Sequence, residues 1–155
     1  MALNLETRGE RELYKVNKDI FRLACSPDGR RLAFFESSQD GKPAVVKTIS
    51  TSGGDSRELF TLHEGQHLFW GVGISWTPDG RHVVVGGPPV PGKQGADSLP
   101  DDLLIIPVAG GEPRKVKLEI KLRQMSLHPD GKRIAFASHN PKGGTEVWVM
   151  ENFLP

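Results

Sequence analysis

The tetrapeptide Ser26-Pro27-Asp28-Gly29 decides the fold, because it recurs twice more along the chain at constant spacing. The later copies are Thr77-Pro78-Asp79-Gly80 and His128-Pro129-Asp130-Gly131, so successive prolines lie 51 residues apart. Proline presets φ at the first turn position, aspartate accepts hydrogen bonds from the turn's own backbone, and glycine takes positive φ without strain. The recurrence therefore predicts three equivalent turns in a repeat of about 50 residues.

A short β-rich segment precedes and another follows each of these turns. Before the turns, larger and smaller residues alternate with period 2, in the order Leu23, Ala24, Cys25, then Ile74, Ser75, Trp76, then Met125, Ser126, Leu127. We expect the larger side chains to pack between sheets and the smaller ones to allow close approach. Cys25 is the only cysteine, so no internal disulfide forms, and its place in this pattern predicts a buried, inert thiol.

Two further strands complete each repeat. The predicted third strands are Val45 to Ile49, Leu103 to Val108 and Glu146 to Met150. Glycine pairs at Gly53-Gly54 and Gly110-Gly111 then lead into fourth strands at Arg57 to Leu62 and Arg114 to Leu118. Each unit is a four-stranded antiparallel meander of the size of a propeller blade, and the final unit lacks its own fourth strand.

The predicted fold is therefore all-β, a partial β-propeller of about three blades. The predicted boundaries are 17–62 for the first blade, 63–118 for the second and 119–155 for the incomplete third. Residues 1–16 are interpreted as the last two strands of a preceding blade, at Leu3 to Leu5 and Glu12 to Val16. No window shows sustained helical periodicity, so we expect no helix longer than two turns.

These repeats resemble the TolB-like, WD40-like family of β-propeller repeats (PD40 repeats). The resemblance rests on the Ser-Pro-Asp-Gly turns, on Gly110-Gly111-Glu112-Pro113 and on Val147-Trp148-Val149-Met150, and it extends over nearly the whole chain. It implies a non-catalytic propeller that binds protein partners, in the periplasm or cell envelope. It also implies kinship with accessory propeller domains of peptidases, because one fold supports many roles.

Composition and charge exclude several function classes. The 20 basic and 19 acidic residues leave a net charge of +1, which provides no basic surface for nucleic acid. No run of 18 apolar residues occurs, so we expect no membrane insertion. Met1 to Arg11 has no apolar core, so no signal peptide is expected in this chain. The five histidines are scattered, so no metal or cofactor is expected.

The segment His63-Glu64-Gly65-Gln66-His67 spells the H-E-x-x-H pattern of zinc peptidases. That chemistry requires a helix, so that both histidines face one metal ion. The segment instead falls between two predicted strands, and Gly65 disfavours a helix. We therefore expect neither zinc nor peptidase activity at this place, and no catalytic residue elsewhere in the chain.

The variable loops are the predicted binding surface. The short turns lie on one face of a propeller, and the longer, variable connections collect on the other, where binding residues are usual. Trp70 is open to two interpretations, an aromatic anchor for a partner or packing between blades. The candidate binding residues are His63, His67, Phe69, Trp70, Lys93, Gln94 and Asp97.

The predicted function is a protein-binding scaffold and not an enzyme. About three blades do not close a ring, so two copies are expected to form a homodimer with six blades. Three alternatives remain open at this point: an accessory propeller domain, the C-terminal part of a larger envelope protein or peptidase, or a propeller that binds a small molecule or sugar.

Overall fold

The structure is a computed structural model of the chain. It describes residues 2–3, 6–37, 44–61, 73–87, 99–118, 120–139 and 144–153. The described residues form strands and turns and no helix, which confirms the all-β prediction. Accordingly, none of them belongs to a helix that could cross a membrane.

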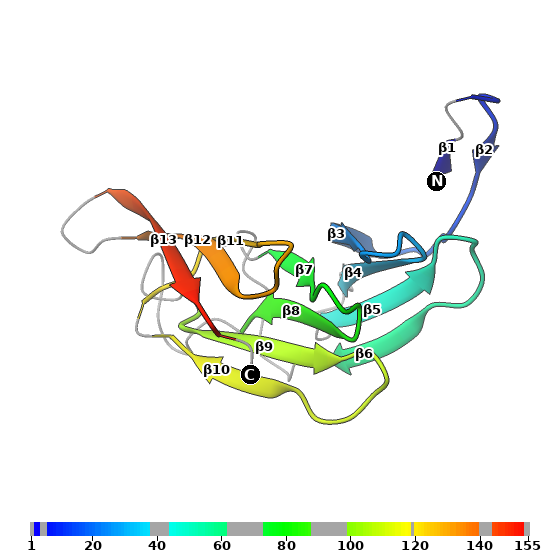
Figure 1. The fold of residues 1–155 in the computed structure, drawn as a ribbon. Coiled ribbons are helices and arrows are strands. Elements are labelled where there is room, and N and C mark those ends of the chain that lie inside the picture. Colours follow the sequence, from blue (N-terminus) through cyan, green and yellow to red (C-terminus); the bar gives the residue numbers. More distant parts are fainter. Residues whose placement is uncertain are drawn as a thin grey trace.

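Three antiparallel sheets follow one another in chain order and fan out side by side (Figure 1). Blade 1 consists of β3 (Asp19–Cys25), β4 (Arg31–Ser37), β5 (Val45–Ser50) and β6 (Arg57–Thr61). Blade 2 consists of β7 (Ile74–Trp76), β8 (His82–Gly86), β9 (Asp102–Pro107) and β10 (Arg114–Lys117). Blade 3 consists of β11 (Gln124–Leu127), β12 (Arg133–His139) and β13 (Thr145–Glu151).

The three Pro-Asp-Gly turns have the same geometry. The backbone N–H of Gly29 donates to the carbonyl of Ser26 at 2.8 Å, and the second and third turns repeat this bond at 2.8 and 2.9 Å. The φ angles of Gly29, Gly80 and Gly131 are 70°, 65° and 70°, which confirms the predicted left-handed glycine in each turn. We call the side of the molecule that carries these turns and the Gly-Gly turns the turn face.

The core lies between the blades, and blade 2 supplies both halves of it. Val83 and Val85 belong to the cluster shared with blade 1, whereas Val84 belongs to the cluster shared with blade 3. Since successive side chains of a strand point to opposite faces, a strand buried on both faces has an unbroken apolar sequence. The same alternation on β9 places Leu104 and Ile106 toward blade 1 and Leu103 and Ile105 toward blade 3.

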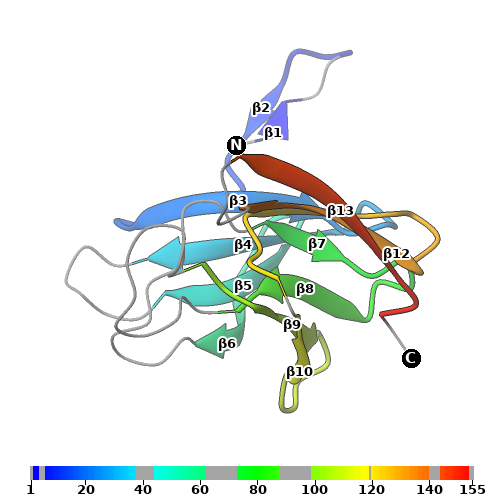
Figure 2. The same cartoon turned by 90° about the vertical axis from the view of Figure 1, so that its left-hand side faces the viewer.

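The N-terminal residues form a small separate sheet. β1 (Ala2–Leu3) pairs with β2 (Glu10–Arg11), and this hairpin stands off from the blades beside blade 1 (Figures 1 and 2). The prediction of a strand from Glu12 to Val16 is wrong, because these residues pair with no strand. Instead Tyr14 packs on blade 1, with its ring 5.4 Å from that of Phe34.

A buried carboxylate holds this N-terminal segment to blade 1. Glu36 is 2% exposed. Its two oxygens accept from the Tyr14 hydroxyl at 2.7 Å, from Lys18 Nζ at 2.8 Å and from Lys47 Nζ at 2.9 Å. Burial raises the pKa of Glu36, but these three hydrogen bonds outweigh it and lower the pKa to about 2. The carboxylate therefore stays charged and fixes residues 14 and 18 against the sheet.

The two terminal blades leave apolar surface open to solvent. Leu23 is 62% exposed on blade 1, and Val147 and Val149 are 80% and 59% exposed on blade 3. This contradicts the predicted burial of Leu23, whereas the equivalent Ile74 is buried as predicted. The reason is that, among the described residues, no sheet packs against the outer side of blade 1 at Leu23. We call these surfaces the blade 1 flank and the blade 3 flank.

Candidate functional site

The seven predicted binding residues lie outside the part of the chain that the structure describes. These are His63, His67, Phe69, Trp70, Lys93, Gln94 and Asp97. The H-E-x-x-H segment lies outside it as well. Binding through the variable loops, and the absence of zinc and peptidase activity at this segment, therefore stay predictions.

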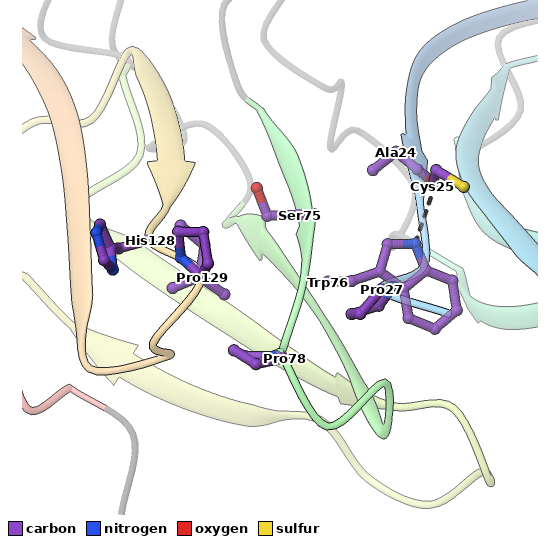
Figure 3. Close-up of a pocket in the computed structure, with 9 residues that line it drawn as sticks. Ala24, Cys25, Pro27, Ser75, Trp76, Pro78, His128 and Pro129 are labelled. Atoms are coloured by element: carbon purple, nitrogen blue, oxygen red, sulfur yellow. Dashed lines mark hydrogen bonds between the residues drawn. The ribbon is translucent and has the colours of Figure 1, made fainter. Parts of the chain in front are cut away.

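Among the described residues, a pocket of about 410 Å³ opens where the innermost strands meet their turns (Figure 3). The strands β3, β7 and β11 are neighbours along the inner side of the arc. Each of the three blades contributes the same elements, the end of its first strand and the proline of its turn. The pocket is lined by Ala24, Cys25, Pro27, Ser75, Trp76, Pro78, Leu127, His128 and Pro129.

Trp76 fixes the junction of blades 1 and 2 beside this pocket. Its indole Nε1 donates to the carbonyl of Ala24 at 3.0 Å, the bond drawn as a dashed line in Figure 3. Trp76 is 6% exposed, because its ring also packs in the core between the two blades. The residue is therefore rigidly placed and gives the pocket a fixed apolar wall.

Cys25 is exposed, so the prediction of a buried thiol is wrong. Cys25 holds the position in β3 that Trp76 holds in β7, and it lines the same pocket. Its neighbour Leu32 in the β3–β4 register faces the blade 1 flank. The thiol is open for the same reason as Leu23, because no sheet in the described part of the chain covers this side of β3.

The turn aspartates serve the turns, as predicted. Asp28 Oδ1 accepts from the Ser26 hydroxyl at 2.6 Å and from the backbone N–H of Arg30 at 3.1 Å. These two bonds lower the pKa of Asp28. Asp79 makes the equivalent bonds, and Asp130 accepts from the backbone N–H of Lys132 at 2.8 Å. Their carboxylates are thus occupied by their own turns.

His128 replaces the hydroxyl residue of the third turn, and a basic pair forms around its aspartate. Asp130 Oδ2 accepts from Arg133 Nη2 at 2.8 Å and lies 3.0 Å from His128 Nδ1. The hydrogen bond from the Lys132 N–H, followed by those from Arg133 and His128, lowers the pKa of Asp130. Across the described residues, no three His, Cys, Asp or Glu side chains are grouped as metal ligands.

A second pocket, of about 470 Å³, lies on the turn face between blades 2 and 3. Its presence follows from a difference between repeats. Arg31 of blade 1 reaches the turn of blade 2 and donates to the carbonyl of Gly80 at 3.0 Å. The equivalent residue of blade 2 is the shorter His82, which lines the pocket together with Gly131, Arg114 and Lys132. Neither pocket was predicted from the sequence, although the aligned repeats already differ at this position, with Arg31 in blade 1 and His82 in blade 2.

Comparison with known proteins supports the fold and little beyond it. No protein-family model matches the chain. No curated protein matches it by sequence either. Among solved structures, TolB from Acinetobacter baumannii is similar at a TM-score of 0.67 and 15% identity, over 97% of this chain. An oligogalacturonate lyase from Vibrio parahaemolyticus is similar at a TM-score of 0.67 and 13% identity, over 96% of this chain. Prolyl endopeptidases reach a TM-score of 0.62 at 18% identity, over 86% of this chain.

These likenesses confirm β-propeller blades. The chain spans 34% of the length of that TolB, 40% of that lyase and 20% of the prolyl endopeptidase. The described sheets therefore correspond to part of a larger propeller protein in each comparison. At such low identity the likeness extends to fold and not to activity.

The expectation that the chain is not an enzyme has to be corrected. Structures with the same arrangement of blades include enzymes, an oligogalacturonate lyase bound to manganese (TM-score 0.68) and prolyl endopeptidases. That expectation came from a resemblance to non-catalytic propellers, whereas proteins named as enzymes also contain blades of this fold. The fold therefore does not place this chain among non-enzymes.

Proposed function

We propose that this chain is a protein-binding propeller unit whose partners cover the flanks of its terminal blades. The observation that carries the proposal is the exposure of Leu23 on one flank and of Val147 and Val149 on the other. Large apolar side chains gathered on sheet faces are typical of interfaces, because water contact with such patches is unfavourable. Within the blades, the equivalent positions are buried in the two core clusters.

The open edge of β13 supports the same proposal. Blades 1 and 2 each have four strands, whereas blade 3 has three among the described residues. Trp148 on β13 is 44% exposed. An unpaired strand edge with exposed apolar residues readily accepts a strand from another chain. Protein binding through β13 would therefore combine backbone hydrogen bonds with apolar burial.

Retention by the immobilised chain tests this function. The wild-type chain, a Val147→Lys/Val149→Lys variant and an Ala109→Lys control are immobilised and exposed to an extract that also contains the free chain. Ala109 is exposed on the Gly-Gly turn of blade 2, so the control adds one lysine away from the two flanks. We expect bound protein on the wild type and the control and its loss on the double variant. The proposal is contradicted if the wild type, the double variant and the control retain equal amounts of other proteins and of the free chain.

A small-molecule site is the second candidate function, and the pocket shared by the three innermost strands favours it. Its described lining has three prolines and Trp76 and only one side chain able to carry positive charge, His128. Such a lining suits a neutral, partly apolar ligand better than an acidic sugar. Titration with neutral and acidic oligosaccharides, followed by Trp76 fluorescence with Trp76→Phe as the control, tests it. An unchanged emission with every sugar contradicts it.

An envelope location also stays part of this proposal. The likeness to TolB is consistent with it. Fractionation of source cells with a tagged chain tests it, and recovery of the tag in the cytoplasmic fraction contradicts it.

A further inference from the structure

Three arginines make the same contact on three successive blades. Arg57 Nη2 of blade 1 donates to the carbonyl of Ala109 in the Gly-Gly turn of blade 2, at 2.8 Å. Arg114 Nη2 of blade 2 donates to the carbonyl of Phe153 at 3.3 Å, where blade 3 has its corresponding turn. In both contacts an arginine at the start of a fourth strand reaches forward to the next blade.

The third contact comes from the N-terminal hairpin. Arg11 Nη1 donates to the carbonyl of Ser52 in the Gly-Gly turn of blade 1, at 2.7 Å. The three acceptors occupy equivalent places; they are Ser52, Ala109 and Phe153. In each blade, the residue just before the acceptor donates its backbone N–H to a carbonyl in the Pro-Asp-Gly turn. That carbonyl belongs to the residue that follows the turn glycine. These backbone bonds are Thr51 to Arg30 at 2.9 Å, Val108 to Arg81 at 2.9 Å and Asn152 to Lys132 at 2.6 Å.

The strand register also makes Arg11 equivalent to Arg57 and Arg114. Arg57 lies opposite Thr48 in the β5–β6 pair, and Arg114 lies opposite Ile105 in the β9–β10 pair. Arg11 lies opposite Ala2 in the β1–β2 pair. By both contact and register, β2 is the fourth strand of a blade that precedes blade 1. Within the described residues only the two-residue β1 stands in for the third strand of that blade.

Blade 3 has the complementary deficiency. Its third strand, β13, is long and well paired to β12, yet no fourth strand follows among the described residues. The position on β13 equivalent to Thr48 and Ile105 is Val149, which is 59% exposed. β13 therefore has an unpaired edge, and β2 lacks a full-length neighbouring strand. The register places the residues of β13 where the missing neighbour of β2 would be.

The blade 1 flank and the blade 3 flank correspond to the two sheet faces that meet between successive blades. Val83 and Val85 of blade 2 face blade 1, and their equivalents on blade 1 are Leu32 and Phe34. Both face the blade 1 flank, where Tyr14 covers Phe34 and Leu23 remains exposed. Val84 faces blade 3, and its equivalent there is Ala135, opposite Val149 on the open blade 3 flank. One flank thus corresponds to the face that each blade turns to its predecessor, and the other to the face it turns to its successor.

We propose that a second copy of this chain is the partner that covers these flanks, with β2 of each copy serving as the fourth strand of blade 3 of the other. This inference rests on the proposed protein-binding function. Arg11 of one copy then lies opposite Val149 of the other, and β13 takes the place of the short β1. Two such junctions are related by a two-fold axis, which is the commonest symmetry of oligomers. They close a ring of six blades, within the usual range of about four to eight.

The ring also gives Arg133 a role. Arg133 is the blade 3 equivalent of Arg31, which spans the junction between blades 1 and 2 by donating to Gly80. In the single copy, Arg133 turns back to Asp130 of its own turn, at 2.8 Å. In the ring, it faces the carbonyl of Gly29 of the second copy.

Sedimentation equilibrium of the chain at micromolar concentration is the first test. We expect a mass twice the 17.0 kDa of one copy. The Val147→Lys/Val149→Lys variant should be monomeric with an unchanged circular dichroism spectrum, and the Ala109→Lys control should stay dimeric. A wild-type monomer, a dimeric double variant, or an assembly of more than two copies each overturns the inference. A monomer that still retains other proteins through Val147 and Val149 leaves the proposed function intact.

A disulfide tests the register directly. Lys115 lies opposite Leu104 in blade 2, so Glu12 of one copy should lie opposite Trp148 of the other. Opposed Cα atoms in antiparallel strands are about 4.5–5.5 Å apart, which suits a disulfide. In a Cys25→Ser background, Glu12→Cys with Trp148→Cys should give a covalent dimer on mild oxidation. The shifted pair Glu12→Cys with Glu146→Cys should give far less. Equal yields from both pairs, or none from the first, overturn the proposed strand pairing.

Discussion

The guanidinium carbon of Arg31 lies 5.0 Å from the centre of the Trp76 ring, across the junction of blades 1 and 2. The same guanidinium donates to the carbonyl of Gly80, and the indole of Trp76 donates back to Ala24. The two residues lie in different repeats, yet each holds the backbone of the other's blade. Rigid blade-to-blade placement here therefore depends on a few specific side chains as well as on the apolar core.

Arg31→Ala should lower the free energy of unfolding by about 1–2 kcal/mol, because it removes both a charged hydrogen bond and a cation–π contact. Arg31→Lys should recover part of the loss, since a lysine keeps the charge but not the planar group. Arg30→Ala is the control, because the contacts of Arg30 shown by the structure are made by its backbone. Denaturant melts of the three variants measure this, and equal stability of Arg31→Ala and Arg30→Ala would refute it.

Alanine should be tolerated unequally at the three turn glycines. Each has positive φ, so alanine costs about 1–2 kcal/mol of left-handed strain at all three positions. A Cβ at Gly131 would also lie 2.9 Å from the Pro78 ring, whereas one at Gly29 meets nothing within 4 Å. In the Val147→Lys/Val149→Lys chain, where no second copy lies against blade 1, thermal melts should therefore rank Gly131→Ala below Gly29→Ala. Gly29→Asn serves as the control, because asparagine tolerates this region better. A reversed order would contradict the turn packing.

Glu36 should make stability depend on pH in the acid range. Its pKa lies at about 2 in the folded chain, below the ordinary 4.5, so the folded state binds fewer protons than the unfolded state between these values. Its stabilising contribution is therefore complete above pH 4.5 and is lost as the pH falls toward 2.

Glu36→Gln should remove this dependence and lower stability at pH 7 by about 1–3 kcal/mol, since two lysines lose the buried negative charge that they pair with. Glu112→Gln, an exposed carboxylate on a turn, is the matched control. Urea melts from pH 7 to pH 2 provide the measurement. A Glu36→Gln curve parallel to that of the wild type would show that Glu36 does not govern the pH response.

The reactivity of Cys25 should report the state of the blade 1 flank. In one copy the thiol is exposed, whereas the equivalent Trp76 is buried by a neighbouring blade. The Val147→Lys/Val149→Lys variant should thus react quickly with a thiol reagent, and the wild type should react more slowly as its concentration rises. Cys25→Ser provides the blank. Rates that are equal at all concentrations would mean that no second blade covers β3.

The blades, the order of their strands and their turns could be predicted from local sequence signals. Three Pro-Asp-Gly turns and two Gly-Gly pairs are local signals, because a turn depends on the φ preferences of the few residues that form it. The predicted third and fourth strands agree with β5, β6, β9, β10 and β13 to within one or two residues. Period-2 alternation likewise placed Ile74 and Trp76 in the core.

Which surfaces of these strands are covered could not be predicted in this way, because it depends on how the blades pack together. Leu23 and Cys25 have the same pattern as Ile74 and Trp76, but they are exposed. Burial requires an adjacent blade, and none of the described sheets lies against that side of β3. The equivalence of Arg11 with Arg57 and Arg114 also emerged only in three dimensions. Arg57 and Arg114 each lie three residues after a Gly-Gly pair, whereas Arg11 follows no such pair. The period-2 pattern of a strand predicts which side chains share a face. Whether that face is buried depends on whether another blade packs against it.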